Sequence, residues 1–328
     1  MRTTMLTLTL TLALVFMGTL SAFSANKYDN PDTLFVARDG TGEFRNVGDA
    51  VEVCRAFMDY HKVIFVKKGV YKEKLIIPSW LDNIEIVGED VETTIITFDD
   101  HANVRQEGTE RAMGTFRTYT LKIEGNGIVL KNITIENNSA RLGQAVALHT
   151  EGDRLQFIGC RFLGHQDTIY TGKGGTRLLF RDCYIEGTTD FIFGPSTVWF
   201  EGCTIKSKAN SYVTAASTPE GVAFGYVFNR CRLIADEGVD KVYLGRPWRP
   251  FAHTLFMHCE LGGHIRPEGW HNWGKTSNEE TTRYEEYENS GPGAAKEQRA
   301  PWSRQLTKKE AQGVTMERVF SINSTWKP

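Results

Sequence analysis

The chain lacks an excess of charge of either sign. Its 328 residues include 38 Lys and Arg and 40 Asp and Glu, which gives a net charge of -2. A protein that holds nucleic acid through its phosphates needs a basic face, and this balance gives no sign of one. We therefore expect no nucleic acid among its partners. With 41% hydrophobic and 11% aromatic residues, the chain is also too apolar for wholesale disorder.

Several catalytic signatures are missing as well. The sequence contains no G-x-S-x-G motif, no H-E-x-x-H motif and no C-x-x-C pair. The first absence argues against a serine esterase built on a nucleophile elbow. The other two mean that no zinc site is indicated.

Long apolar runs are absent except near the N-terminus. Residues 6–20 are rich in Leu, Thr and Val, Arg2 is the one charge before Lys27, and small residues follow at 21–25. This pattern predicts a signal peptide over residues 1–24, with an N-terminal membrane anchor as the alternative. We expect residues 25–328 to form a single domain that is secreted or periplasmic, has no membrane anchor and is monomeric.

Five of the six cysteines belong to an internal repeat. Each has Phe three residues before it and a large apolar residue two after it, at Cys160, Cys183, Cys203, Cys231 and Cys259. The intervals of 23, 20, 28 and 28 residues, without helical periodicity, predict an all-β solenoid of stacked coils, the parallel β-helix. Equivalent cysteines then form an inward ladder with parallel Cβ vectors, which suits disulfides poorly. We expect free thiols, and disulfide bridges are the alternative.

The region before the repeat predicts a cap. Residues 33–37 and 62–66 have the composition of strands. Between them an apolar stripe follows helical spacing at Val47, Ala50, Val51, Cys54 and Phe57. This predicts a short N-terminal capping helix that covers the open end of the β-helix. The repeat fades after Gly274, so residues 275–328 are expected to pack along the outside.

Two carboxylates occupy the same phase of adjacent coils. Asp167 and Asp190 each follow a ladder cysteine by seven residues, so they should lie about 4.8 Å apart, the spacing of neighbouring strands. Two such groups cannot both ionise comfortably, and the pair can divide into an acid and a nucleophile. Gln144, 23 residues before Asp167, and Gln166 could supply oxyanion donors. The alternative is a polar ladder that only satisfies turns.

The motif LGRPW at 244–248 adds a cation and an aromatic ring. Arg246 stands between Gly and Pro. Its guanidinium can donate two parallel hydrogen bonds to a carboxylate and keep that carboxylate ionised. Trp248 offers a flat face to a sugar ring, although simple packing would also explain it. Together these residues indicate a carbohydrate-active groove. Retaining glycosidases also place two carboxyls about 5 Å apart, so glycoside and ester hydrolysis both remain open.

Six motifs, taken in order, resemble those of one family. They are GVYKE at 69–73, GQAVAL at 143–148, HQDTIY at 165–170, DFIFG at 190–194, LGRPW at 244–248 and RPEGW at 266–270. On these motifs the sequence resembles the pectin methylesterases, the pectinesterase family of carbohydrate esterases, over nearly the whole chain after residue 24.

The resemblance implies a right-handed parallel β-helix that hydrolyses methyl esters of galacturonate in pectin. It implies that Asp190 is the nucleophile, Asp167 the proton donor and later base, Gln144 and Gln166 the oxyanion donors, and Arg246 the group that orients Asp190. Substrate contacts would come from Thr115, Gln144, Arg246 and Trp248. No metal or organic cofactor is implied. The alternatives are a β-helix glycoside hydrolase acting on pectin and a β-helix that binds pectin without turnover.

Overall fold

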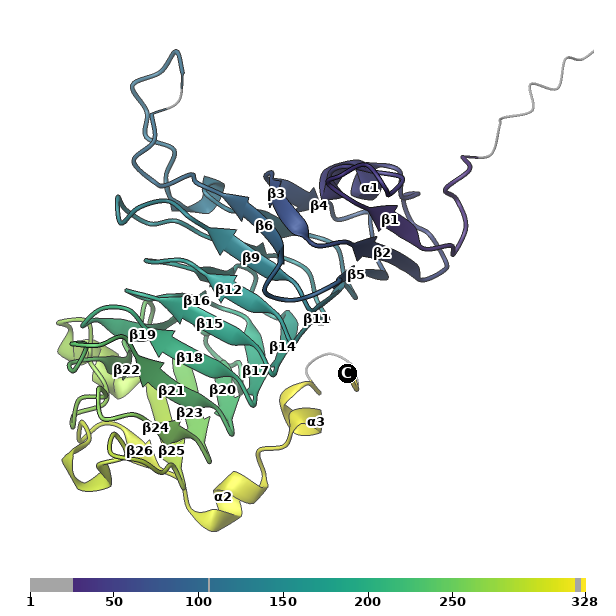
Figure 1. Ribbon diagram of the computed structural model, residues 1–328. Coiled ribbons are helices and arrows are strands. Elements are labelled where there is room, and N and C mark those ends of the chain that lie inside the picture. The colour runs from purple at the N-terminus through teal and green to yellow at the C-terminus, as the bar shows by residue number, and fades with distance from the viewer. Residues whose placement is uncertain (1–25, 106, 322–325) are drawn as a thin grey trace, which may run out of the picture.

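The computed structural model describes residues 26–105, 107–321 and 326–328 (Figure 1). The predicted signal peptide, residues 1–24, lies outside the described residues. Within the described part the chain winds into three parallel sheets, which we call A, B and C. Each coil passes from sheet A to sheet B and then to sheet C, so all neighbouring strands in a sheet are parallel. The predicted all-β parallel β-helix is confirmed.

The sheets have these members, given in spatial order. Sheet A contains β1 (Leu34–Val36), β2 (Lys62–Val66), β5 (Ile84–Gly88), β8 (Val129–Lys131), β11 (Leu155–Ile158), β14 (Arg177–Arg181), β17 (Thr197–Glu201), β20 (Tyr226–Asn229), β23 (His253–Met257), β25 (Arg283–Tyr287) and β26 (Arg304–Gln305). Sheet B contains β3 (Gly69–Lys72), β6 (Thr94–Phe98), β9 (Thr134–Asn137), β12 (Arg161–Leu163), β15 (Tyr184–Gly187), β18 (Thr204–Ser207), β21 (Arg232–Ala235) and β24 (Glu260–Leu261). Sheet C contains β4 (Leu75–Ile77), β7 (Leu121–Ile123), β10 (Leu148–Thr150), β13 (Ile169–Thr171), β16 (Ile192–Gly194), β19 (Tyr212–Ala216) and β22 (Tyr243–Gly245).

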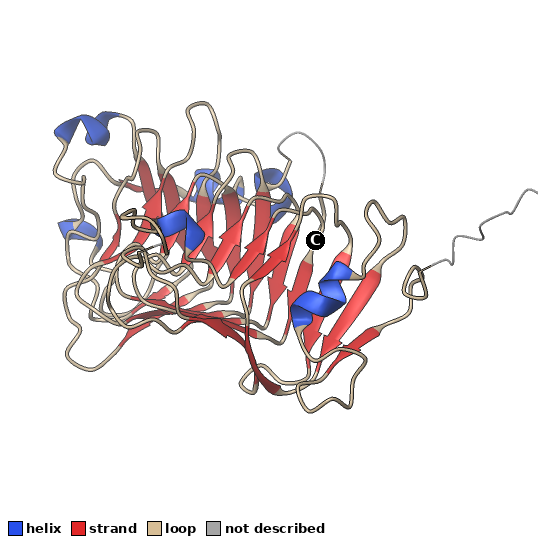
Figure 2. Ribbon diagram, turned by 90° about the horizontal axis from the view of Figure 1, so that it is seen from above, coloured by secondary structure: helices blue, strands red, loops and turns tan. Residues whose placement is uncertain are grey.

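Helices are few and lie outside the sheets (Figure 2). They are α1 (Val47–Glu52), α2 (Lys308–Gln312), α3 (Met316–Val319) and the 3-10 turns η1 (Thr115–Arg117), η2 (Thr276–Glu280) and η3 (Lys296–Gln298). Among the described residues, no helix combines the length and the apolar character needed to cross a bilayer.

The turn from sheet A to sheet B explains the cysteine repeat. The residue before each ladder cysteine has a positive φ, which bends the chain sharply between two short strands. These residues are Gly159, Asp182, Gly202, Arg230 and His258, with φ of 60°, 54°, 63°, 53° and 55°. Gly tolerates this left-handed region best, and Asp and His enter it more readily than most other residues, whereas Arg230 adopts it against its preference. The bend brings the ladder cysteine into the interior.

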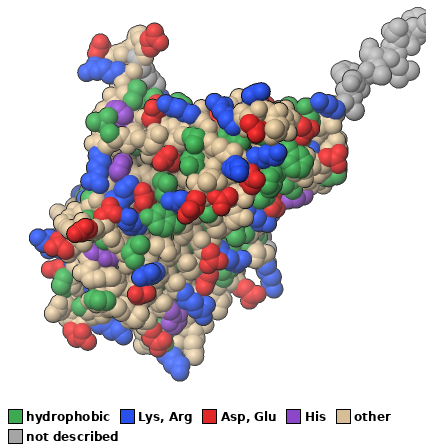
Figure 3. Space-filling model, in the orientation of Figure 1, with side chains coloured by type: hydrophobic (Ala, Val, Ile, Leu, Met, Phe, Trp, Pro, Cys, Tyr) green, Lys and Arg blue, Asp and Glu red, His purple; other side chains and the backbone are tan. Residues whose placement is uncertain are grey.

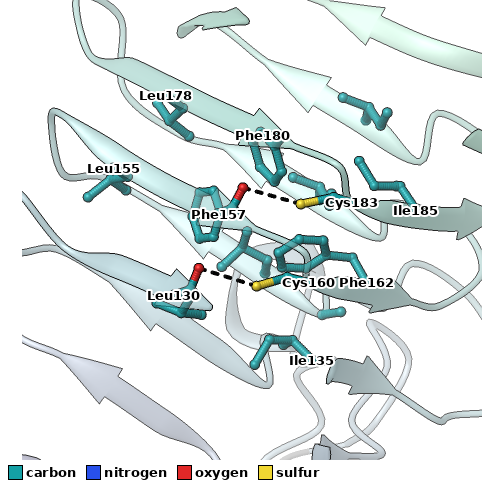
Figure 4. Packing of buried hydrophobic residues seen from close by; sticks show 14 of the residues in the cluster. Leu130, Ile135, Leu155, Phe157, Cys160, Phe162, Leu178, Phe180, Cys183 and Ile185 are labelled. Carbon is teal, nitrogen blue, oxygen red and sulfur yellow. Dashed lines mark hydrogen bonds between the residues drawn. The ribbon is translucent and has the colours of Figure 1, made fainter. Parts of the chain in front are cut away.

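Each ladder cysteine is buried and contacts the previous coil through sulfur. Cys160 donates to the Leu130 carbonyl at 3.4 Å and Cys183 to the Phe157 carbonyl at 3.3 Å (Figure 4). Beside them Phe157 and Phe180 stack with ring centroids 4.5 Å apart, and the stack continues through Phe200, Phe228 and Phe256. All six cysteines are free, as predicted.

The free state of the thiols can be tested by alkylation. In the folded protein the six cysteines should resist alkylation, because all are buried and burial raises, for example, the pKa of Cys54 to about 11. After denaturation without reductant, mass spectrometry should find six alkylated thiols. Two or three thiol pairs protected from the reagent until reduction would contradict the ladder.

The N-terminal cap is shorter than the sequence pattern indicates. Helix α1 buries Val47, Ala50 and Val51 against β1, β2 and β4, as predicted. It ends at Glu52, however, and the following turn redirects the chain. Phe57 has a φ of 55° and a side chain that is 78% exposed, so its assignment to the apolar face was wrong.

The C-terminal segment differs in part from the prediction. The expected packing along the outside holds for residues 306–320, where Leu306, Val319 and Phe320 cover Leu179 and Trp199 on the outer face of sheet A. Figure 1 shows α2 and α3 on that side of the sheet. The solenoid itself continues past Gly274, because β25 pairs with β23 in register and buries Tyr284.

Candidate active site

The candidate site is a hollow on the outer face of sheet C. Its volume is about 320 Å³. It is lined by Thr115, Phe116, Gln144, Gln166, Asp167, Asp190, Phe193, Ala215, Arg246, Trp248 and Trp273. The structure therefore brings together every residue that the sequence proposed for the site. Most of the polar members stand just before strands of sheet C, where successive coils enter it, and Arg246 follows β22 directly.

The two carboxylates lie on adjacent coils at equivalent positions. Ile169 on β13 pairs with Ile192 on β16, and the Asp167 N–H donates to the Thr189 carbonyl at 3.0 Å. This register places Asp167 beside Asp190, as the seven-residue offset predicts. Gln144 is shifted by one residue relative to the expectation. The Ala145 N–H donates to the Gln166 carbonyl at 3.0 Å, so Gln144 lies beside Gln166 rather than beside Asp167.

Both aspartates share an uncommon backbone conformation. Asp167 has a φ of 67° and Asp190 a φ of 49°. The left-handed region is rare for residues other than glycine, although Asp is among those that enter it. The neighbouring coils hold this conformation, for example through the Asp190 N–H, which donates to the Tyr212 carbonyl at 2.9 Å. Strained conformations of this kind cluster at functional sites.

Arg246 grips Asp190 with two hydrogen bonds. Its Nε donates to Oδ1 at 2.9 Å and its Nη2 to Oδ2 at 2.6 Å. The guanidinium lies between two rings, 4.0 Å from the Tyr212 centroid and 3.7 Å from the Trp273 centroid. This sandwich restricts the guanidinium to one orientation, and the fork fixes the carboxylate of Asp190 in turn.

The environment gives the two carboxyl groups different pKa values. Burial raises the pKa of Asp167 well above its ordinary value, and the charge of Asp190 raises it further. Burial also raises the pKa of Asp190, but the Arg246 hydrogen bonds oppose that rise. Asp190 therefore ionises at a lower pH than Asp167, and Asp167 holds its proton to a higher pH than Asp190 does.

Four aromatic side chains line the hollow, and Tyr170 packs beside them. Tyr170 stacks on Phe193 at 4.7 Å between centroids and contacts Phe116 at 4.8 Å. Phe193 meets Trp248 edge to face at 5.7 Å. Such a surface suits the apolar faces of sugar rings.

Comparison with known proteins places the chain in a family. A family model described as Pectinesterase matches residues 33–323. The chain belongs to the pectinesterase family. It is 37% identical to Pectinesterase 31 of Arabidopsis thaliana over 84% of this chain and 88% of that protein. It is also 37% identical to a probable pectinesterase/pectinesterase inhibitor of Brassica napus, over 83% of this chain but about half, 48%, of that longer protein.

Solved structures of the pectinesterase family have the same architecture. A pectin methylesterase from carrot superposes with a TM-score of 0.82 at 32% identity, over 88% of this chain and 93% of that one. The pectin methylesterase PemA from Erwinia chrysanthemi gives 0.78 at 26% identity, over 90% and 98%. A pectin methylesterase in complex with a hexasaccharide matches equally well. The right-handed parallel β-helix predicted from the sequence is confirmed.

Four residues that line this pectinesterase-family groove were not among the predicted site residues: Phe116, Phe193, Ala215 and Trp273. Trp273 follows the RPEGW motif by three residues, but only the structure shows that its ring covers Arg246. Ala215 on β19 pairs with Phe193 on β16, so both side chains lie on the outer face of sheet C. On the next coil the equivalent position is that of Arg246. The alternation of β19 could have indicated Ala215, whereas nothing in the loop sequence indicated Trp273.

Proposed function

We propose that this protein hydrolyses the methyl esters of galacturonate residues in pectin and releases methanol and pectate. The observation that carries the proposal is the arrangement of the carboxyls: Asp190 is gripped by Arg246, and Asp167 lies beside it at a raised pKa in an aromatic-lined hollow. Family membership supports the same conclusion.

In the first step Asp190 attacks the ester carbonyl carbon through one carboxylate oxygen. The carbonyl oxygen becomes an oxyanion, which the amide N–H groups of Gln144 and Gln166 stabilise. When this intermediate collapses, the bond to the methoxy oxygen breaks. Asp167 gives its proton to that oxygen, so methanol leaves as a neutral molecule and an anhydride joins the sugar to Asp190.

The second step regenerates the enzyme. Asp167, now a carboxylate, accepts a proton from water while the water oxygen attacks the galacturonyl carbon of the anhydride. The bond to Asp190 breaks, Asp190 leaves as a carboxylate held by Arg246, and the sugar leaves as a free acid. Thr115 and Trp248 line the hollow on either side and would hold neighbouring rings of the polymer.

Methanol release tests the reaction. Methylated pectin mixed with the protein should release methanol and take up base, with no increase in reducing ends. Reducing ends without methanol would favour the glycoside hydrolase, and binding without either product would favour a non-catalytic pectin-binding protein. The absence of methanol from every methylated pectin would overturn the proposal.

The setting of the activity is also a proposal. Residues 1–24 would serve as a signal peptide, and residues 25–328 would act as a single secreted or periplasmic domain. The protein would be monomeric and would have no membrane anchor. The apolar run at 6–20 supports export, and a polymeric substrate, too large to cross a membrane intact, would be met outside the cytoplasm.

A further inference from the structure

The RPEGW motif at 266–270 leads the chain along the edge of sheet C, beyond β22. Gly245 forms a parallel bridge with Trp270, and the His271 N–H donates a hydrogen bond to the Gly245 carbonyl at 3.1 Å. This register places His271 one coil beyond Arg246, at the equivalent position. The motif therefore puts an imidazole next to the guanidinium that holds the proposed nucleophile.

His271 contacts both aromatic residues that enclose the Arg246 guanidinium. Its ring centroid lies 5.5 Å from that of Tyr212, and its Nδ1 accepts a hydrogen bond from the Trp273 N–H at 3.2 Å. The Cζ atom of Arg246 lies 4.0 Å and 3.7 Å from the centroids of the Tyr212 and Trp273 rings. The His271 ring also packs 5.3 Å from that of Tyr243. His271 thus connects the two halves of the enclosure around Arg246.

Trp273 has a strained backbone, which neighbouring side chains support. Its φ is 62°, and a bulky residue in the left-handed region is an outlier that persists only where the surrounding structure imposes it. The Trp273 N–H donates to His271, and the Gly274 N–H donates to Asn272 Oδ1 at 2.8 Å. The Asn272 side-chain amide donates in turn to Glu279 at 2.7 Å. The position of the Trp273 ring therefore depends on side-chain acceptors, one of which is the imidazole of His271.

The imidazole of His271 must be neutral to accept this hydrogen bond, because both ring nitrogens of a charged histidine are donors. Burial lowers the pKa of His271, and the charges of Arg246 and Arg266 lower it further. The Cζ atom of Arg266 lies 4.8 Å from the centroid of the Tyr243 ring. Basic and acidic side chains are interspersed on the face in Figure 3, whereas both of the charges that act on this pKa are positive. The surroundings therefore favour the form of His271 that can accept.

We propose that His271 is a positioning residue, which holds Trp273 over Arg246 so that the guanidinium keeps the orientation in which it binds Asp190. The inference rests on the proposed ester hydrolysis. Without the hydrogen bond to His271, Trp273 can leave the left-handed conformation, and Arg246 loses one of the two rings that restrict it. Its two hydrogen bonds to Asp190 then weaken. Because those bonds oppose the rise that burial causes in the pKa of Asp190, this pKa should increase.

Substitutions at His271 separate the acceptor from the ring. His271→Phe keeps a ring beside Tyr212 and removes the acceptor. His271→Asn removes the ring and keeps an acceptor, because an Asn side chain can accept from the N–H two residues further on. His271→Ala, which lacks both, is the second test should the larger ring of Phe disturb the packing. The matched control is His61→Phe, at a histidine whose side chain is 51% exposed beside β2 in sheet A.

The expected losses lie in the rate of methanol release from methylated pectin at neutral pH. His271→Phe should lose about tenfold in kcat, His271→Asn less than about threefold, and the control His61→Phe less than about twofold. KM should change by less than about twofold in each variant, because His271 acts through Arg246 rather than on the sugar. Far-UV circular dichroism of each variant establishes that the rates are those of folded proteins.

The pH profile distinguishes positioning from a merely structural role. Arg246, Asp167 and Tyr284 are the charged and titratable groups that act on or respond to Asp190, and Asp167 and Tyr284 both have raised pKa values. The acid limb of kcat/KM therefore reports the ionisation of Asp190. This limb should move to higher pH by about half a unit or more in His271→Phe and stay in place in His271→Asn.

Three results would overturn the inference. They are equal losses in His271→Phe and His271→Asn, an acid limb that stays in place in His271→Phe, and a loss in His271→Phe no greater than that of the His61→Phe control. The proposed function fails separately, when the wild type releases no methanol from any methylated pectin.

Discussion

Asp190→Asn is expected to lower the rate of methanol release by roughly 10³-fold or more, because the variant has no carboxylate to attack the ester carbonyl. An amide in the same place is a poor nucleophile. It also lacks the negative charge of the carboxylate to which Arg246 donates two hydrogen bonds. Far-UV circular dichroism should remain that of a β-helix, since the side chain lines a groove rather than the interior. Initial methanol release and the spectrum are measured on the same preparation.

Asp182→Asn is the matched control for this variant. Asp182 also has a left-handed backbone, with a φ of 54°, but it lies exposed at the turn before Cys183, away from the groove. The same substitution there should leave the rate within about twofold, as expected for a surface site. A folded Asp190→Asn that keeps more than about a tenth of the wild-type rate, a loss under roughly 1.4 kcal/mol, would show that Asp190 is not the nucleophile.

Much of the site could be predicted because a parallel solenoid converts sequence intervals into spatial neighbours. Cys160 and Cys183 fix the phase of their coils, since each follows a sharp turn and points inward. A residue seven positions later therefore reaches the same place on each coil. This is why Asp167 and Asp190 could be paired from the sequence alone, before any geometry was known.

The prediction failed where no ladder residue fixes the phase. The coil of Gln144 has no cysteine, and its loop differs in length, so the register slips by one residue. Beyond Gly274 the cysteine signal ends, although Tyr284 still enters the interior on β25. The position of Phe57 in the sequence fits helical spacing, but α1 ends at Glu52, before the chain reaches Phe57.

The cations that line the two hollows adjoining the candidate active site could not be placed from the sequence either. Arg111 and Lys275 belong to segments between strands, and the positions of such segments depend on packing rather than on periodicity. Their approach to the groove is therefore visible only in the folded chain.

Asp167→Asn is expected to be inactive and, at neutral pH, more stable than the wild type. Without a group that protonates the methoxy oxygen or activates water, both steps should slow, by about 10² to 10⁴-fold overall. Methanol release by purified protein measures this loss. The variant should fold normally, because Asn also tolerates the left-handed backbone that Asp167 adopts at φ 67°.

The stability gain follows from the raised pKa of Asp167, which burial and the neighbouring Asp190 both produce. A carboxyl with a raised folded-state pKa contributes stability below its unfolded pKa of about 3.9, and this contribution is lost as pH rises through the folded value. Asn stays neutral throughout, so the variant avoids the loss. Each tenfold change in proton affinity corresponds to about 1.4 kcal/mol, or roughly 2 °C or more in Tm.

Thermal unfolding of both proteins between about pH 4 and pH 7 measures this difference. The Tm of Asp167→Asn should nearly equal that of the wild type at the acidic end and should exceed it increasingly as the pH rises. The control Asp182→Asn, whose side chain is exposed, should show no such trend. A Tm difference that is independent of pH, or that favours the wild type at neutral pH, would mean that Asp167 is ionised in the free enzyme. It could then not be the acid that protonates methanol, and another proton donor would have to be found among the groups that line the hollow.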